Sequence, residues 1–374
     1  MTKILFLIRD LGQGGAEKVL VNLVNNMDST KFDISVIALF GGGVNEQFLA
    51  PHIHFRSIWK HSLPGNSHLM KVLSPTQLHK LCVKEHYDIE VSYLEGPAAR
   101  VISGCPHKDT KLVSWIHVQQ NNLKTLCKAF RSEKEARRCY NRFHQTICVS
   151  EYVKEDFCGL LQFQSPCRVL YNTVESDKIL SLSKESAPEI RPIEGLNMIA
   201  VGTLKESKGY DRLLHIIKRL KSEKRPGHLY ILGVGDLQQW IETYIRENDL
   251  SDSVTLLGYQ TNPYKYVEKC DLFVCASHAE GFSTAATEAL IVSTPVCTVE
   301  VSGMKEMLGE NNEYGIVTDN TEDALYEGIR KFMDDPAVLE HYTRQATLRG
   351  KDFSTEETVR AVETMLEKLK GGPT

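Results

Sequence analysis

The chain has 374 residues, 42% of them hydrophobic and 25% charged, and a formal net charge of −4 at pH 7. This composition excludes fibrous and disordered classes, and the length exceeds that over which one hydrophobic core keeps growing, so we expect two domains. No segment approaches the roughly 18 consecutive apolar residues of a membrane-spanning helix, and the acidic balance without a dense basic and aromatic stripe disfavours nucleic-acid binding.

The N-terminus carries a short apolar run, Ile4 to Ile8, that Arg9 and Asp10 interrupt before a signal-peptide core could form. Ten cysteines are present without a CxxC pair or a sequence cluster of Cys and His, which argues against a zinc site and against a secreted disulfide scaffold. We therefore expect reduced thiols and a cytoplasmic protein, with the inner face of the cell membrane as an alternative location.

The apolar run at the N-terminus is the first of two series of predicted strands, which are separated by segments with helical periodicity. In the first half the predicted strands are Ile4–Ile8, Ile34–Phe40, Ile89–Tyr93, Leu112–Ile116 and Thr146–Val149. In the second half they are Met198–Val201, Leu229–Leu232, Val254–Leu257, Leu272–Ala276 and Pro295–Val299. Strands that alternate with helices at this spacing are typical of parallel sheets covered by helices, so the sequence predicts an α/β protein with two such sheets.

Residues 174–195 separate the two series of strands. They are polar, contain two prolines and show no strand pattern, which is typical of a linker. We therefore divide the chain into an N-terminal domain of residues 1–180 and a C-terminal domain of residues 181–354.

The last segment, residues 355–374, has apolar side chains at helical spacing, and Ser354 with Glu357 matches a capping box. It predicts a final helix, which we expect to pack back toward the N-terminal domain. Ligands of open parallel sheets bind beyond the carboxyl ends of the strands, so the loops that follow the strands are where functional residues are expected.

One such loop follows the strand predicted at 272–276, and a helix then opens near Ser283 or Thr284. Unpaired backbone N–H groups and the positive end of the helix dipole favour a diphosphate at this helix N-terminus. Glu288 lies about two turns into the helix, where its carboxylate is suited to accept hydrogen bonds from ribose hydroxyls.

Glu280 and Glu288 are separated by seven residues, in a strand–loop–helix setting that a Pro–Val strand follows. This arrangement resembles the donor-site signature of the retaining family 4 glycosyltransferases, or glycosyl transferases group 1, which have the GT-B fold. The resemblance implies two Rossmann-like parallel-sheet domains that face a central cleft, with a nucleotide sugar held by the C-terminal domain. It assigns to the donor site Gly281, Phe282, Ser283, Thr284 and Glu288, with Glu280 near the transferring sugar.

Residues 201–211 resemble the loop after the first strand of the family's second domain, where an Arg and, five residues later, a Lys hold the diphosphate. Lys208 matches that lysine, whereas Thr203 occupies the arginine position. Lys205 is the candidate to supply the missing cation, although a lysine lacks the bidentate fork of an arginine. The resemblance also assigns Gly202 to the donor site.

Two further segments follow the family's order. Residues 231–236 resemble a glycine turn that brings backbone near the donor, although a tight turn closing a strand–helix unit explains the pattern equally well. Tyr259 lies where the family contacts the base of the nucleotide.

A glycine-rich segment, residues 10–18, follows the first predicted strand. A dinucleotide fingerprint requires a small residue where Glu17 stands, which argues against NAD binding and a dehydrogenase. The segment resembles instead the Gly-Gly-Ala-Glu loop of the same family. The resemblance assigns Gly14 and Gly15 to the acceptor side, with Gly15 also near the transferring group of the donor.

Three polar residues follow later strands of the first half. His117 matches the family's histidine that contacts the donor sugar, although a lone histidine after a strand is more often structural. Asn172 lies in a segment that fits the family pattern and is assigned to the acceptor side. Ser150 is predicted to begin a helix.

Lys and Arg outnumber Asp and Glu in residues 1–180, and the reverse holds in the rest of the chain. The basic excess is densest in residues 124–142, which have a helical pattern. Such charges usually mark a solvated face, but the first domain in this family can lie against a membrane whose lipid carries the acceptor. Peripheral membrane contact through this stretch is therefore one expectation, and a solvated face is the other.

The resemblance implies a retaining, metal-independent hexosyltransferase that transfers a hexose or N-acetylhexosamine from a nucleotide-diphosphate sugar, with UDP favoured. The expected acceptor is a glycan, lipid-linked or protein-linked, in surface polysaccharide or glycoconjugate synthesis, and no separate cofactor is implied. His117, Lys208 and Glu280 are the candidate catalytic residues, because a departing diphosphate puts charge on phosphate oxygens that preorganised donors stabilise. Front-face and covalent mechanisms both stay open.

Two other kinds of protein stay open. A nucleotide-sugar epimerase or phosphorylase of the same architecture would turn over the donor alone or require inorganic phosphate. A non-catalytic or partner-dependent subunit of a paired glycosyltransferase would bind the donor without turnover, and Thr203 in place of the usual arginine favours this alternative.

Overall fold

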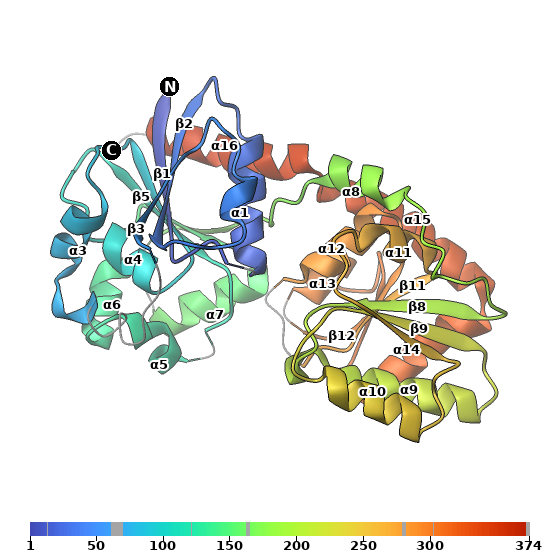
Figure 1. The fold of residues 1–374 in the computed structure, drawn as a ribbon. Helices are drawn as coiled ribbons and strands as arrows, with labels where there is room; N and C mark the ends of the chain where they lie inside the picture. Colours follow the sequence, from blue (N-terminus) through green and yellow to red (C-terminus); the bar gives the residue numbers. More distant parts are fainter. Residues whose placement is uncertain are drawn as a thin grey trace. The chain divides into compact units, whose positions relative to one another are not determined.

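The computed structural model describes residues 1–12, 14–60, 70–120, 122–161, 165–278, 282–301 and 303–371, apart from the side chain of Leu161. The chain forms two compact units, each built around one parallel sheet (Figure 1). Unit 1 comprises Met1–Val174 and Thr355–Thr374, and unit 2 comprises Glu175–Ser354.

The sheet of unit 1 has seven parallel strands in the order β3-β2-β1-β4-β5-β6-β7, with helices on both sides (Figure 1). The strands are β1 Thr2–Ile8, β2 Phe32–Phe40, β3 His54–Trp59, β4 Ile89–Tyr93, β5 Lys111–Ile116, β6 Gln145–Cys148 and β7 Cys167–Val169. The helices are α1 Gly15–Asn26, α3 Pro75–Cys82, α4 Pro97–Ile102, α5 Leu123–Leu126, α6 Glu133–Tyr140, α7 Glu151–Leu161 and α16 Thr355–Gly371. Because both faces are covered, the central strands read as continuous apolar runs.

The sheet of unit 2 has six parallel strands in the order β10-β9-β8-β11-β12-β13. The strands are β8 Leu196–Val201, β9 Gly227–Leu232, β10 Val254–Gly258, β11 Leu272–Cys275, β12 Val296–Val299 and β13 Ile316–Thr318. The helices are α8 Ser176–Ser183, α9 Tyr210–Ser222, α10 Gln238–Glu247, α11 Tyr264–Lys269, α12 Thr284–Ile291, α13 Met304–Leu308, α14 Glu322–Asp334 and α15 Pro336–Asp352. The core lies between the sheet and the apolar faces of α9, α10 and α14.

The predicted α/β class and the two parallel sheets are confirmed, and each of the ten predicted strands is present. The strands that the sequence pattern missed are β3, β7 and β13, which all lie at a sheet edge. Edge strands bury less surface: β3 has no fully buried residue, and β7 and β13 have three residues each. The predicted linker also contains a helix, α8, which packs against α11 and was too short to show a clear period.

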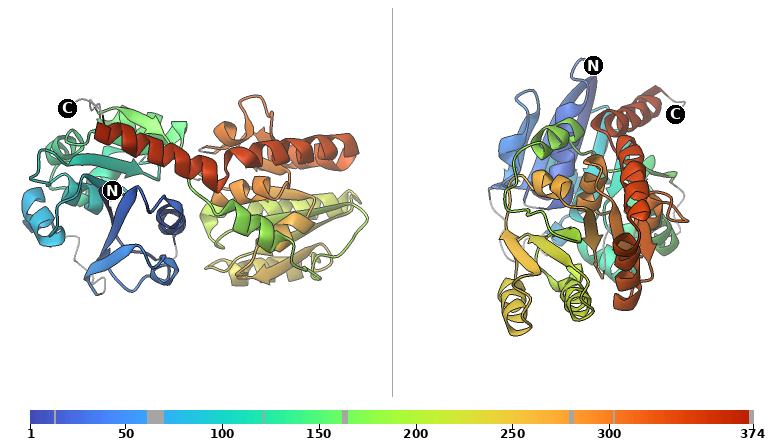
Figure 2. Two further views of the ribbon diagram at one scale, coloured as in Figure 1. Left: turned by 90° about the horizontal axis from the view of Figure 1, so that it is seen from above. Right: turned by 90° about the vertical axis from the view of Figure 1, so that its right-hand side faces the viewer.

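Helix α16 belongs to unit 1, where it packs against α1. Glu363 Oε1 accepts a hydrogen bond from the Asp28 N–H at 2.6 Å, and Lys370 Nζ lies 3.2 Å from Asp88 Oδ2. Figure 2 shows α16 as a separate rod that follows α15 in the chain. The final helix predicted from the sequence is therefore present and contributes to the core of unit 1 through Val359, Val362 and Leu366.

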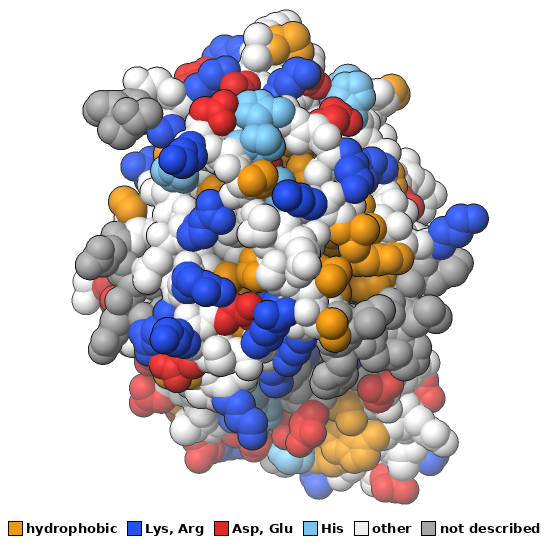
Figure 3. Space-filling model, turned by 90° about the vertical axis from the view of Figure 1, so that its left-hand side faces the viewer, with side chains coloured by type: hydrophobic (Ala, Val, Ile, Leu, Met, Phe, Trp, Pro, Cys, Tyr) orange, Lys and Arg blue, Asp and Glu red, His pale blue; other side chains and the backbone are white. Residues whose placement is uncertain are grey.

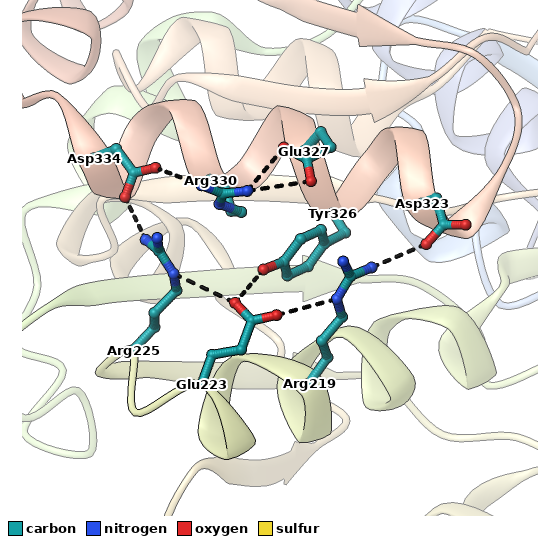
Figure 4. Close-up of polar contacts among 8 residues, drawn as sticks. All are labelled: Arg219, Glu223, Arg225, Asp323, Tyr326, Glu327, Arg330 and Asp334. Atoms are coloured by element: carbon teal, nitrogen blue, oxygen red, sulfur yellow. Dashed lines mark hydrogen bonds and ion pairs between the residues drawn. The ribbon is translucent and has the colours of Figure 1, made fainter.

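A network of charged side chains ties the end of α9 to α14 in unit 2 (Figure 4). Glu223 is at its centre: its Oε1 accepts a hydrogen bond from Arg219 Nε at 3.2 Å, and its Oε2 lies 3.4 Å from Arg225 Nε and accepts a hydrogen bond from the Tyr326 hydroxyl. The Arg219 guanidinium also lies 3.7 Å over the Tyr326 ring. Because most of these groups face solvent, each pair contributes little, and the network serves mainly to orient the two helices.

Candidate active site

The candidate residues of unit 1 lie in loops at the carboxyl ends of β1, β4, β5 and β7. All strands of this sheet are parallel, so these loops lie along one edge. Gly14 is the N-terminal cap of α1 and Gly15 is its first residue. A side chain at Gly14 would collide with the Glu17 carboxylate, whereas the space over Gly15 is open for 4 Å. The first turn of α1 therefore presents backbone N–H groups at this edge.

His117 follows β5 and is buried, with 5% of its surface exposed. Burial lowers the pKa of its imidazole to about 3, so the ring is neutral at pH 7. Its ring centroid lies 4.6 Å from that of Tyr93, and Nε2 has no hydrogen-bond partner among the described residues. A neutral imidazole with an unpaired buried nitrogen is suited to a hydrogen bond with a sugar hydroxyl. Without a hydrogen bond from a ligand or water, burial of this nitrogen destabilises the fold.

Glu95 is a residue of this edge that the sequence analysis missed. It follows β4, and its Oε2 accepts a hydrogen bond from the backbone N–H of His117 at 3.1 Å. Burial raises the pKa of its carboxyl to about 7, although these backbone contacts oppose the shift. An acidic residue two positions after the end of a fully buried strand was the available signal, since a carboxylate there must find partners at the sheet edge.

Other polar atoms of unit 1 are buried without a partner among the described residues. They include Tyr93 Oη and Asn172 Oδ1. Tyr93 ends β4 and Asn172 follows β7, so both lie toward the edge that carries His117. Since buried polar groups are nearly always hydrogen-bonded, several unpaired ones along one edge point to a ligand or water there.

The loop after β8 holds the candidate diphosphate residues of unit 2. The Lys208 side chain lies against Gly202, where an added Cβ would be 3.7 Å from Lys208 Cε. Thr203 and Lys205 are exposed in the same loop, and a short 3-10 turn, Glu206–Lys208, follows them. The structure therefore brings Gly202 and Lys208 together, with Thr203 and Lys205 beside them in the chain.

Glycines let this loop pack closely against its neighbours. A side chain at Gly233 would collide with the Gly202 carbonyl oxygen, and φ at Gly233 is +142°. A side chain at Gly209, where φ is +66°, would collide with the Ala276 carbonyl oxygen. The turn at 231–236 thus has a packing role against the candidate diphosphate loop, in keeping with the structural alternative considered for it.

Helix α12 begins at the residues expected from the sequence. Ser283 is its N-terminal cap and accepts a hydrogen bond from the Ala286 N–H at 3.3 Å, and Thr284 is its first residue. The loop before it joins the Lys208 loop through a 2.8 Å hydrogen bond from the His278 N–H to the Ser207 carbonyl. The Lys208 loop and the loop that leads to α12 are therefore joined at the carboxyl ends of the adjacent strands β8 and β11.

Four other predicted residues remain, and the structure describes two of them. Glu280 and Gly281 lie outside the described residues. Phe282 is buried, with its ring centroid 6.0 Å from that of Phe353, so its side chain packs in the core of unit 2. Tyr259 is 71% exposed after β10, two strands away from β8.

Glu288 is the fifth residue of α12, in its second turn, and is partly buried. The Tyr264 hydroxyl donates a hydrogen bond to its Oε1 at 3.3 Å. This contact from α11 restricts the rotamer of Glu288, so its carboxylate has a defined direction on the helix.

Some basic side chains of residues 124–142 form hydrogen bonds and ion pairs within unit 1. Arg131 donates to the carbonyls of Lys71 and Val72, Arg142 donates to the carbonyl of Cys105 at 2.8 Å, and Arg137 pairs with Glu133. A surface hollow of about 680 Å³ remains over α6, lined by Arg131, Ser132, Lys134, Glu135, Arg138, Asn141 and Arg142.

Figure 3 shows Lys and Arg side chains spread over one face beside a group of apolar side chains. Val72, next to the carbonyls that Arg131 contacts, is 71% exposed. Among the described residues no helix is both long and apolar enough to cross a membrane.

Two families match the chain in succession. Residues 13–178 match the family described as Glycosyltransferase Family 4, and residues 184–349 match the family described as Glycosyl transferases group 1. Together they cover most of both units.

A similar protein from Campylobacter jejuni is 28% identical over 378 residues, which cover 96% of this chain and 98% of that protein. It is named N-acetylgalactosamine-N,N'-diacetylbacillosaminyl-diphospho-undecaprenol 4-alpha-N-acetylgalactosaminyltransferase.

Solved structures share the whole fold. A glycosyltransferase from Rickettsia africae has a TM-score of 0.79 at 15% identity and covers 100% of this chain and 99% of that one. Anabaena HepE, crystallised in complex with UDP, has a TM-score of 0.76 at 19% identity and covers 98% of this chain and 100% of that one. With two family matches in the expected order and the two-sheet fold, the chain belongs to glycosyltransferase family 4, the glycosyl transferases group 1, and is a glycosyltransferase of GT-B fold.

Proposed function

We propose that this protein transfers a hexose or N-acetylhexosamine from a UDP-sugar to a glycan, lipid-linked or protein-linked acceptor, with retention of anomeric configuration and without a catalytic metal. The observation that carries the proposal is the hydrogen bond between His278 and Ser207, which joins the Lys208 loop to the loop leading from β11 to α12 at the carboxyl ends of β8 and β11. A cation and the unpaired N–H groups of a helix N-terminus at one place are suited to a diphosphate.

In this proposal the donor binds to unit 2. Lys208 and the N–H groups at Ser283 and Thr284 stabilise the charge that develops on the leaving diphosphate. Gly202, Gly281 and Phe282 contribute backbone at the same place. Lys205 supplies a second cation in place of the arginine that Thr203 replaces, and because a lysine binds phosphate as a point charge, we expect weaker orientation of the diphosphate.

The nucleoside is the other part of the donor. Glu288 accepts hydrogen bonds from the ribose hydroxyls, in the direction that the Tyr264 contact favours. Tyr259 contacts the base; its exposed ring after β10 is available for stacking. UDP is favoured because Anabaena HepE, which has the same fold, was crystallised with UDP.

The sugar and the acceptor involve residues of unit 1. Neutral His117 hydrogen-bonds a hydroxyl of the transferring sugar through Nε2, which also satisfies a buried nitrogen. Gly14, Gly15 and Asn172 contact the acceptor, and Gly15 also lies near the transferring group. Glu280 is the proposed carboxylate beside the sugar.

A lipid-linked acceptor is favoured because the Campylobacter relative is named for a diphospho-undecaprenol substrate. Lys124, Lys128, Lys134 and Arg138 are then available for anionic headgroups, with Val72 as an apolar contact. This surface would hold the protein at the cytoplasmic face of a membrane, where such an acceptor is presented.

The test is a donor-turnover assay with the purified full chain, a panel of UDP-, GDP- and ADP-sugars, and polyprenyl-diphosphate glycans as acceptors. We expect transfer from a UDP-hexose or UDP-N-acetylhexosamine, and Lys208→Ala should lower kcat/KM by about 10²-fold, the usual cost of losing one stabilising donor. Lys218→Ala is the matched control, because Lys218 lies in the C-terminal half of α9, where its Nζ donates a hydrogen bond to Asn248 at the end of α10. Equal rates for both variants would remove Lys208 from the site.

A partner-dependent subunit is the second candidate, because Thr203 stands where the family has an arginine. It predicts UDP binding without turnover until a partner chain is added. Thr203→Arg separates the two: a faster single-chain enzyme favours the first proposal, whereas unchanged inactivity with intact UDP binding favours the second.

A further inference from the structure

Two loops meet at the amino ends of β4 and β5, on the edge of the unit 1 sheet opposite to the one that carries Glu95 and His117. The first loop precedes β4 and contains His86, and the second precedes β5 and contains His107 and Asp109. These residues are not used by the proposed transfer reaction.

The three side chains converge on one point. His86 Nε2 lies 3.1 Å from Asp109 Oδ2, and the ring centroids of His86 and His107 are 4.8 Å apart with the rings nearly perpendicular. One ligand atom from each of the three residues lies within 4.8 Å of those of the other two. The side chains are open to solvent, with 49% of His86 and 74% of Asp109 exposed, and Figure 3 shows histidine side chains gathered beside acidic ones on the surface.

The backbone that carries these side chains is held firmly. Next to His86 and Asp109, the Thr110 hydroxyl donates a hydrogen bond to the Tyr87 carbonyl at 2.8 Å, and both partners are buried. The Lys111 N–H donates to the Asp88 carbonyl at 2.9 Å as the sheet begins. The two loops therefore cannot separate without breaking buried contacts, so little conformational freedom remains to be lost when a ligand binds.

We propose that His86, His107 and Asp109 form a surface site for a divalent transition-metal ion of the zinc type. Zinc takes imidazole nitrogen and carboxylate oxygen at about 2.0–2.2 Å in a tetrahedron, which puts neighbouring ligand atoms a little over 3 Å apart. The 3.1 Å between His86 and Asp109 already matches one edge of that tetrahedron. A rotation of the exposed His107 side chain completes the set, and water takes the fourth position.

The two imidazole nitrogens and one carboxylate of this site favour some divalent metals over others. Two imidazoles with one carboxylate suit Zn²⁺, Ni²⁺ or Cu²⁺, whereas Mg²⁺ and Ca²⁺ require mostly oxygen ligands. The ion would not take part in sugar transfer, because the site lies at the opposite edge of the sheet. The inference is thus independent of the proposed function.

A second group on the inner side of the same loops is the rival site. It consists of His79, Glu90 and Cys105, all buried. These side chains satisfy one another: His79 Nε2 lies 2.8 Å from Glu90 Oε2, and the Cys105 thiol lies 3.5 Å from Glu90 Oε1. We therefore assign the ion to the outer group.

The test is calorimetric titration of ZnCl₂ into the full chain, produced without a histidine tag. We expect one ion to bind the wild type, and His86→Ala and His107→Ala each to weaken binding by more than about tenfold, the loss known for groups that only support a ligand. The matched control is His54→Ala. His54 lies 3.3 Å from Asp33 on the same unit, which gives an exposed His–Asp pair without a second histidine.

Co²⁺ absorption distinguishes the two groups, because only a cysteine ligand gives an intense thiolate-to-metal band. The outer site predicts a spectrum without that band and unchanged by Cys105→Ser. Absence of binding to the wild type, equal weakening by His54→Ala and His86→Ala, or a thiolate band that Cys105→Ser removes would each overturn the proposal. Circular dichroism of the variants checks that a lost site does not reflect a lost fold.

Discussion

Arg100 is the largest of the fully buried side chains, and its replacement should destabilise unit 1. It extends from α4, and its guanidinium makes a two-pronged pair with Glu135 of α6, with both distances 3.1 Å. Its remaining donors reach the carbonyls of Met70 and Leu73 at 2.8 Å each. One side chain thus joins α4, α6 and the segment before α3.

The expected cost of Arg100→Met is about 3–5 kcal/mol, the range for removing one partner of a buried ion pair. Methionine keeps much of the volume, but it leaves the Glu135 carboxylate and two carbonyls without their donor. The Arg131 N–H still donates to Glu135 at 2.7 Å, which limits the loss. Since a domain has only about 5–15 kcal/mol of net stability, unit 1 should unfold at a much lower urea concentration.

The loss of unfolding free energy caused by Arg100→Met should also depend on pH. Burial acts to raise the pKa of Glu135, but hydrogen bonds from Arg100 and the Arg131 N–H hold the pKa below its usual value. The stability that this carboxylate contributes is therefore present above about pH 4.3 and is lost as the pH falls further. The difference between wild type and Arg100→Met should narrow below that pH, because protonated Glu135 no longer needs the cation.

The assay is urea unfolding followed by tryptophan fluorescence. Trp59 and Trp115 report on unit 1 and Trp240 on unit 2, so a Trp240→Phe background isolates the unit 1 transition. Arg137→Met is the control, because its side chain pairs with Glu133 at the surface of unit 1. A cost under about 1 kcal/mol for Arg100→Met, the range of exposed pairs, would refute this account of Arg100.

Three further predictions concern other groups. Burial raises the pKa of Glu95 to about 7, so the protonated carboxyl contributes stability to unit 1 that is complete below about pH 4.3 and is lost as the pH rises through 7. Glu95→Gln should therefore make the free energy of unfolding, measured with urea, less dependent on pH between these values. The same pH dependence in wild type and variant would contradict this prediction. Glu223→Gln should lower the free energy of unfolding of unit 2 by less than about 1 kcal/mol, because the network in Figure 4 is largely exposed. Trp240 fluorescence follows this transition. A decrease above about 3 kcal/mol would contradict the prediction and show that the network holds α14 in place. His117→Ala should lower donor turnover by about 10²-fold, and circular dichroism checks that the variant, which loses a buried ring, is still folded. The exposed His52→Ala should leave the rate unchanged. Equal rates for the two variants would contradict the role proposed for His117.

Much of the fold could be predicted because both sheets are covered on both faces. Central strands such as Ile4–Ile8 are then fully buried, and their apolar runs stand out in the sequence. The edge strands β3, β7 and β13 lack that signal because one side has no neighbouring strand and the strands are short or half-exposed. Helix α8 escaped notice because it is short and only one apolar side chain, Ile179, is fully buried where it packs against α11 and α12.

The candidate site also contains residues that could be predicted from the sequence and residues that could not. Ser283 and Thr284 could be predicted because capping residues and helix starts leave local patterns, and the structure places α12 where expected. Glu95 carries no such pattern: its role depends on the distance to the His117 backbone, which only the pairing of β4 with β5 creates. The same holds for His86 and Asp109, which are far apart in the sequence and 3.1 Å apart in space.

The most direct test of the central claim, a UDP-sugar site at the carboxyl ends of β8 and β11, is calorimetric titration of UDP into the wild type and Glu288→Ala. We expect the wild type to bind UDP, and the variant to bind at least about tenfold more weakly with unchanged unfolding, because the ribose loses a charged hydrogen-bond acceptor. Glu242→Ala, on the surface helix α10, is the matched control. Equal affinity of wild type and Glu288→Ala for UDP, or a wild type that binds another nucleotide and not UDP, would contradict the account.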